Sequence, residues 1–103
     1  MLMSVHTDVF RILGDPLRMQ IVELLAREQL CTCHLVAETG ARQTNVSNHL
    51  RVLREAGLVE AEPAGRYTYY RLVPEVLDGL TARLGELAAA ARSTSDLRRP
   101  ACD

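Results

Sequence analysis

The sequence has no long apolar run, almost no net charge and few cysteines, and each shortage excludes a class of protein. No segment approaches the roughly 18–20 apolar residues that span a bilayer. The start, MLMSVHTDVF, lacks the basic segment and apolar stretch of a secretory signal. The three cysteines are an odd number, which argues against a disulfide framework. We therefore expect a cytoplasmic protein with reduced thiols and no membrane partner.

The sequence also lacks the arrangements that small enzymes use. It contains no C-x-x-C redox motif, no βαβ pattern, and no Ser/His/Asp or paired-carboxylate set. An enzyme such as a small thiol–disulfide oxidoreductase is therefore not expected. The formal net charge of −1 gives no overall basic character either. Basic residues do gather locally, because residues 42–54 hold Arg42, His49, Arg51 and Arg54 and no acid.

The 103 residues, of which 48% are hydrophobic, predict one domain that begins with two helices. An apolar-periodic run over residues 5–13 stops at Gly14. Asp15 then caps a second helix that has Pro16 in its first turn and extends over residues 16–29.

A helix-turn-helix pattern follows. Thr32 is expected to cap a short helix from about Cys33 to Thr39, and Gly40 is suited to end it. The next stretch, ARQTN, starts another helix that continues to Gly57. Two helices joined by a short glycine-containing turn are typical of helix-turn-helix proteins.

The second of these helices has two contrasting faces. Val46, Leu50 and Leu53 fall in one narrow sector and predict the buried face. The opposite side carries short polar side chains and one arginine: Thr44, Asn45, Ser47, Asn48 and Arg51. Asn, Ser and Thr are poor residues for the middle of a helix, so their concentration requires another reason, and the reading of base edges supplies one. A winged helix that binds protein and not DNA is the alternative.

A hairpin and a last helix complete the pattern. The stretch LVEAEPAGRYTYYRL predicts a β-hairpin with Arg66 at its tip and its tyrosines in the hairpin core. Residues 75–91 predict a helix with a Leu/Ala stripe, a dimerisation element that pairs with the first helix. We expect residues 1–92 to form the folded domain, and residues 93–103 to form a flexible tail that carries Cys102.

The resulting order (four helices, a hairpin and a final helix) is a mainly α winged helix-turn-helix. It resembles the ArsR/SmtB family of bacterial metal- and metalloid-responsive repressors along nearly the whole chain. The resembling segments are LGDPLRMQIVELL, NVSNHLRVLREAGLVEAEPAGRYTYYRL and LCTCHL, and the last is similar to the cysteine motif of the arsenic-responsive branch.

The resemblance implies a homodimeric repressor that binds a palindromic operator in double-stranded DNA when ligand-free. It implies release when arsenite or antimonite binds cysteine thiolates, with As(III) or Sb(III) as inducer and no permanent cofactor. The DNA contacts it implies are Gln43, Asn45, Ser47, Asn48 and His49, with Arg66 in the wing.

Three positions depart from the family pattern. Arg42 stands where relatives usually have a Ser or Thr that caps the DNA-reading helix. Val36 stands where the arsenic-responsive branch commonly has a third cysteine. Residues 75–91 contain no histidine, which makes the zinc site that other relatives carry on the last helix improbable.

Cys31 and Cys33 are the candidate metalloid ligands, because thiolates are soft ligands that select soft ions. The helix dipole is expected to favour the thiolate form of Cys33, and His34 is expected to be a polar surface residue. Residues two apart on a helix point in nearly opposite directions. We therefore expect ligand binding to bend or unwind the first turn, around residues 32–34.

The identity of the third ligand and of the signal stays open at this point. Cys102 is the candidate third ligand, from either subunit. Cadmium, lead or thiol oxidation are alternatives to arsenite and antimonite on the same DNA-binding fold.

Overall fold

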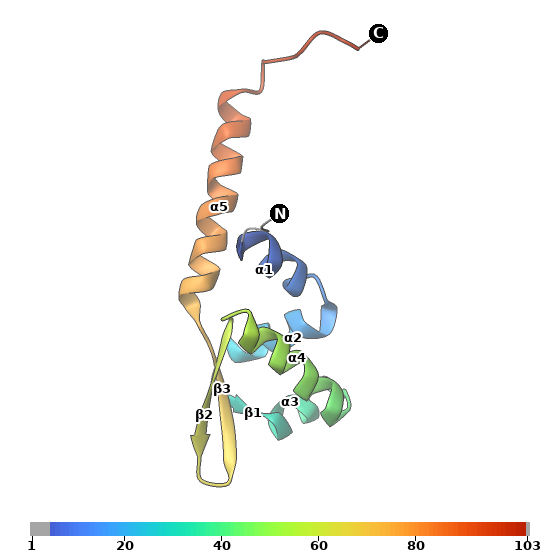
Figure 1. Cartoon of the computed structure of the whole chain (residues 1–103), viewed down its shortest axis with the longest axis vertical. Coiled ribbons are helices and arrows are strands. Elements are labelled where there is room, and N and C mark those ends of the chain that lie inside the picture. The colour runs from blue at the N-terminus through green and yellow to red at the C-terminus, as the bar shows by residue number, and fades with distance from the viewer. Residues whose placement is uncertain (1–4, 103) are drawn as a thin grey trace.

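The computed structural model describes residues 5–102 and has the expected mainly α architecture. In chain order the elements are α1 (Val5–Leu13), α2 (Pro16–Leu25), β1 (Leu30–Cys31), α3 (Thr32–Thr39), α4 (Gln43–Glu55), β2 (Val59–Ala64), β3 (Tyr67–Leu72) and α5 (Pro74–Ser93). The β2–β3 hairpin projects from one end of the molecule, and α5 runs away from the other (Figure 1). Residues 1–4 of the expected domain and residue 103 of the expected tail lie outside the described residues.

The break between α1 and α2 forms as the sequence predicts. The Asp15 carboxylate accepts hydrogen bonds from the backbone N–H groups of Leu17 (2.9 Å) and Arg18 (3.1 Å). These two groups have no partner inside the helix, so the N-cap satisfies them. Pro16 occupies the first turn. The predicted extension of α2 to residue 29 is wrong, because the helix ends at Leu25 and the chain turns towards β1.

One hydrophobic core holds the helices and the base of the sheet together. The predicted inner face of α4 is confirmed, since Val46, Leu50 and Leu53 are at most 1% exposed. The other side chains that are almost fully covered come from α1, α2, α3 and the start of the hairpin: Val9, Ile21, Leu35 and Leu58. Each such side chain contributes about 1.5–3 kcal/mol relative to an exposed one. This core fixes how α3 and α4 sit against each other.

The sheet contains one strand that the sequence pattern did not reveal. Its strand order is β1-β3-β2, and all pairs are antiparallel. In the β1–β3 pair, Leu30 lies opposite Tyr70 and Cys31 lies opposite Tyr69. A strand of two residues is too short to show a period of two, so only its pairing defines it. The hairpin is therefore anchored to the residues that precede α3.

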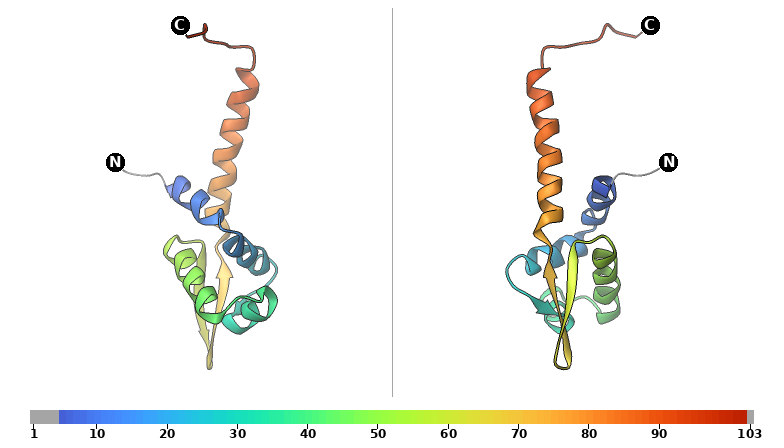
Figure 2. Two further views of the ribbon diagram at one scale, coloured as in Figure 1. Left: turned by 90° about the vertical axis from the view of Figure 1, so that its right-hand side faces the viewer. Right: turned by 60° about the vertical axis from the view of Figure 1, so that its left-hand side comes forward.

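The hairpin itself forms a wing with Gly65 and Arg66 in the turn. Gly65 has φ of +64°, a conformation that glycine adopts at no steric cost. The expectation that the tyrosines form the hairpin core holds for Tyr70, which packs against the core. It is wrong for Tyr67, whose side chain is 58% exposed. The right-hand view of Figure 2 shows the wing beside α4.

The last helix, α5, carries apolar side chains that the rest of the protein leaves exposed to solvent. Leu80 is buried at the base of α5, but Leu84 and Leu87, further along, are 53% and 50% exposed. α1 runs beside the base of α5 in both views of Figure 2 and presents Phe10, which is 38% exposed. Among the described helices, none combines the length and the apolar character that crossing a membrane requires.

Candidate functional site

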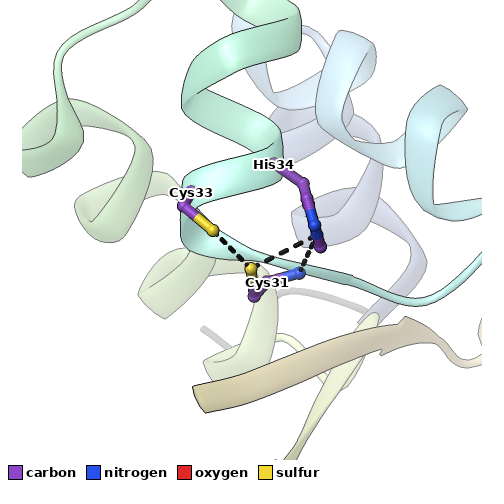
Figure 3. Close-up of side chains that lie close together, drawn as sticks. All are labelled: Cys31, Cys33 and His34. Carbon is purple, nitrogen blue, oxygen red and sulfur yellow. Dashed lines mark hydrogen bonds between the residues drawn. The ribbon is translucent and has the colours of Figure 1, made fainter. Parts of the chain in front are cut away.

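The two cysteines of the C-x-C motif meet at the junction between β1 and α3. Cys31 is the N-cap of α3 and has an extended backbone (φ −90°, ψ 170°), whereas Cys33 lies in the first turn. Their sulfur atoms are 2.7 Å apart, and the two side chains point towards each other in Figure 3. The expectation that an intact first turn separates the two sulfurs is therefore wrong. Because Cys31 belongs to β1, helical geometry does not constrain the direction of its side chain. The prediction that Thr32 caps α3 is also wrong, since Thr32 is the first residue of the helix and Cys31 is the N-cap.

His34 is exposed, as the sequence predicts, and its ring also lies beside this pair. Its Nδ1 atom accepts a hydrogen bond from the backbone N–H of Cys31 (3.2 Å) and lies 3.2 Å from the Cys31 sulfur. A backbone N–H can only donate, so this bond assigns the lone pair to Nδ1. The Tyr69 ring, with its centroid 6.0 Å from that of the imidazole, flanks the cluster. The three donor atoms lie within 4.8 Å of one another.

The two thiols have pKa values that are shifted in opposite directions. Burial alone would raise the pKa of the Cys31 thiol, but hydrogen bonds from the Cys33 side chain and from the backbone N–H groups of His34 and Cys33 lower that pKa below its ordinary value. The hydrogen bond to Cys31 raises the pKa of Cys33, and burial adds to this effect. The predicted preference for a Cys33 thiolate is therefore wrong. Cys31 receives the donors at the start of α3, and its thiolate is the favoured one.

Two adjoining hollows open onto the cysteine pair. The smaller, of about 180 Å³, is lined by the pair, His34, Tyr67 and Tyr69. The larger, of about 300 Å³, is bounded by the pair, by Gln43 at the start of α4, and by wing residues that include Arg66 and Tyr67. The thiols thus share a hollow with two positions that the sequence assigns to DNA contact.

Seven of the eight expected DNA-contacting side chains are exposed on α4 and the wing. They are Gln43, Thr44, Asn45, Ser47, Asn48, Arg51 and Arg66. Arg42 is the N-cap of α4, and it makes no side-chain cap hydrogen bond. This agrees with the absence of a Ser or Thr at that position.

His49, the eighth, is held against α2. Its Nδ1 accepts a hydrogen bond from Arg18 Nε (3.2 Å), its Nε2 lies 3.9 Å from the Asp15 carboxylate, and its side chain is 17% exposed. Hydrogen bonding by the Arg18 backbone N–H lowers the pKa of Asp15 against the opposing effect of burial, and His49 assists. Sequence reasoning missed Asp15 and Arg18 as partners of α4, because residues 31 positions apart share no local signal.

The remaining cysteine is not part of this cluster. Within one chain, the C-terminal end lies at the opposite end of the molecule from α3 (Figure 1). Val36, at the position where a third cysteine is common, packs against the core.

Known proteins resemble this chain in sequence and in fold. Residues 15–61 match the family of bacterial regulatory proteins described as the arsR family. The arsenic resistance transcriptional regulator ArsR1 of Pseudomonas putida is 42% identical over 74% of this chain, which spans 60% of that protein. The arsenical resistance operon repressor of Bacillus subtilis is 34% identical, with 77% of this chain and 76% of that protein aligned. A transcriptional repressor SmtB homolog of Synechocystis is 40% identical over 63% of this chain and 49% of its own length.

A solved structure supports the same assignment. The homodimeric winged helix-turn-helix DNA-binding domain Mb0332 of Mycobacterium bovis is 27% identical, with a TM-score of 0.67 over 91% of this chain and 86% of that one. The matching sequence family, the coverage of the Bacillus repressor and the shared winged helix agree. The chain belongs to the ArsR family of DNA-binding transcriptional regulators.

Proposed function

We propose that this protein is a homodimeric repressor that binds a palindromic operator when ligand-free and leaves it when arsenite or antimonite binds Cys31 and Cys33. The observation that carries this proposal is the 2.7 Å contact between the two sulfur atoms, in a hollow that also borders Gln43 and Arg66. The arsenical-resistance names of two relatives support the choice of metalloid.

The exposed polar face of α4 is the proposed reading surface. Asn48 and the neighbouring Asn, Ser and Thr residues supply donors and acceptors to base edges, and Arg51 can reach a guanine or a phosphate. Arg66, at the tip of the wing, would contact the DNA backbone beside the groove that α4 enters. His49 is held against α2 through Arg18, so we assign it to the orientation of α4 as well as to the DNA interface.

The proposed dimer joins α1 and α5 of two copies. Leu84 and Leu87 are about half exposed on α5, and Phe10 is partly exposed on α1. Contact with a second copy would bury these side chains at about 25 cal/mol per Å² of apolar surface. The homodimeric state of the Mycobacterium bovis relative supports this arrangement. Two α4 helices about 34 Å apart would enter successive major grooves of a palindromic site.

Arsenite binding needs no oxidant or reductant. Arsenous acid would lose two hydroxyl groups as water while the two thiols lose their protons, and two arsenic–sulfur bonds would form. The Cys31 thiolate is the attacking nucleophile, because its pKa is lowered. The third position on arsenic would keep its hydroxyl group, or Cys102 would take it if a second copy brings its tail to the site, with the third hydroxyl and the Cys102 thiol proton leaving as another water molecule.

The coupling to DNA would pass through the wing, and α3 need not unwind. Cys31 pairs with Tyr69 of β3, and the cysteine pair faces Gln43 and Arg66 across the larger hollow. A bound arsenic atom forces the sulfurs apart and occupies part of that hollow. A shift of the wing relative to α4 follows, and such couplings are typically about 1–3 kcal/mol, or roughly 5–150-fold in affinity.

The test is fluorescence anisotropy with a palindromic operator fragment obtained by selection from random DNA, titrated separately with arsenite, antimonite, cadmium, lead, zinc and peroxide. Tight binding without ligand and release by arsenite or antimonite are expected. Absence of DNA binding in every state would overturn the proposal. Release by peroxide, but not by arsenite, would instead assign the site to thiol oxidation. Cys102→Ser with unchanged arsenite affinity would remove Cys102 from the ligand set.

A further inference from the structure

A hollow of about 480 Å³ lies between α1 and the last turn of α4, and none of the residues that line it belongs to the cysteine pair or to the expected DNA contacts. Its volume falls within the roughly 300–1,000 Å³ that binding pockets occupy. Part of the lining is aliphatic, from Val9, Ile12, Val52 and Ala56. The rest is charged, from Asp8, Arg11 and Glu55. Such a hollow suits a partner that offers an apolar side chain next to a charged one.

The tail after α5 offers this combination. Leu97 is 76% exposed, although it is the single large apolar side chain in the stretch STSDLRR of residues 93–99. Arg98 and Arg99 follow it directly and are exposed. We propose that this tail segment of a second copy docks in the hollow, with Leu97 against the aliphatic side chains. The inference rests on the dimer of the proposed function, because the segment arrives only when two copies pair.

Glu55 gives the hollow a negative charge that its own chain does not neutralise. It is the last residue of α4, where the helix dipole disfavours a carboxylate. In the described part of the chain it forms no ion pair. Asp8, in contrast, is paired with Arg11 at 3.3 Å. Arg98 and Arg99 of a second copy would supply the missing positive charge beside Glu55.

A second copy can bring the tail to the hollow more directly than the chain's own α5 can. α1 runs beside the base of α5 (Figure 2), and the 20 residues of α5 carry their own tail about 30 Å away from that base. In an antiparallel pair of α5 helices with Leu84 opposite Leu87, Ser93 of the second copy lies opposite Asp78, near the base. Residues 94–97 of that copy span at most about 14 Å from there. This reach brings Leu97 to the neighbourhood of α1.

The direct test is nuclear magnetic resonance on a mixture of ¹³C-labelled and unlabelled full-length protein, reduced and without DNA. Isotope-filtered spectra should show contacts between the Leu97 methyl groups of one copy and the Ile12 and Val52 methyl groups of the other. Sedimentation velocity at the same concentration gives the oligomeric state. A dimer that lacks these contacts, or in which another segment makes them, would overturn the inference and leave the proposed dimer standing. A monomer would overturn both.

Variants of the tail and of the hollow supply a second test, with the dimer dissociation constant from sedimentation equilibrium as the readout. Leu97→Ser should raise it at least about tenfold, the factor that burial of a leucine side chain contributes. Cys102→Ser, in the same tail, is the matched control and should dimerise like wild type.

Charge reversal tests the contact with Glu55. Glu55→Arg, and Arg98→Glu combined with Arg99→Glu, should each weaken dimerisation by roughly 2–5-fold, the value of an exposed ion pair. All three changes together should restore most of the loss. Circular dichroism of each variant shows that it folds. Wild-type dimerisation of Leu97→Ser, or no restoration in the combined variant, would contradict the proposed docking.

Discussion

Asp15 joins the start of α2 to α4, and its replacement is expected to reduce stability by two routes that can be separated. Its carboxylate accepts the N–H groups of Leu17 and Arg18, and loss of such a cap costs about 0.5–2 kcal/mol. It also lies 3.9 Å from His49 and 4.0 Å from the Arg18 guanidinium, with the side chain 32% exposed. Exposed pairs of this kind add at most about 1 kcal/mol.

Asp15→Ala should therefore lower the free energy of unfolding by about 0.5–3 kcal/mol, the sum of the two routes. Asp15→Asn keeps a good cap and loses the charge, so its cost should be below about 1 kcal/mol. Urea unfolding followed by circular dichroism measures both, at one protomer concentration because dimerisation affects apparent stability. Equal destabilisation by the two variants would refute the assignment of the larger share to the cap.

The pH dependence supplies a second check on the same residue. The pKa of Asp15 is lowered in the folded state, so its charge stabilises the fold above the unfolded value of about 3.9. This contribution is lost as the pH falls through the folded pKa. The stability difference between wild type and Asp15→Asn should therefore shrink below about pH 4. A difference that grows on acidification would contradict the sign of the shift.

Three further changes test other parts of the molecule. Arg66→Ala should weaken binding to all DNA sequences by similar factors and reduce the slope of log affinity against log salt by about one, measured by anisotropy over a salt series. A sequence-dependent loss would instead make Arg66 a base reader. Leu87→Glu should shift the protein towards monomer in sedimentation velocity, because the side chain is half exposed on the proposed dimer face; an unchanged sedimentation coefficient would exclude that face. Leu53→Ala, at 0% exposure, should lower the free energy of unfolding by about 2–5 kcal/mol in urea denaturation, and a loss below about 1 kcal/mol would show that the core collapses around the cavity.

The helical part of the fold could be predicted because its signals are local. Asp15 and Pro16 mark the start of α2, and Gly40 ends α3 with φ of +73°. The spacing of Val46 and Leu50 assigns the inner face of α4. These features depend on residues within one or two turns of each other, which a single sequence displays.

The candidate site could be predicted in composition but not in geometry. Cys31 takes its conformation from pairing with Tyr69, a contact across many residues of sequence. Helical spacing therefore predicts that the two sulfurs point apart, whereas the strand-to-helix junction brings them together. The same junction directs His34 to the pair and gives Cys31, rather than Cys33, the lowered pKa. The hydrogen bond from Arg18 to His49 also joins residues far apart in the sequence, so tertiary packing alone brings them together.

The most direct test of the central claim is an arsenite titration of the preformed protein–operator complex, followed by anisotropy, for wild type and for Cys31→Ser. The wild type should release DNA with a loss of affinity of about 5–150-fold. Cys31→Ser should bind the operator as wild type does and keep it at every arsenite concentration. Release of DNA from Cys31→Ser at the same arsenite concentration as from wild type would contradict the claim that the C-x-C pair is the switch.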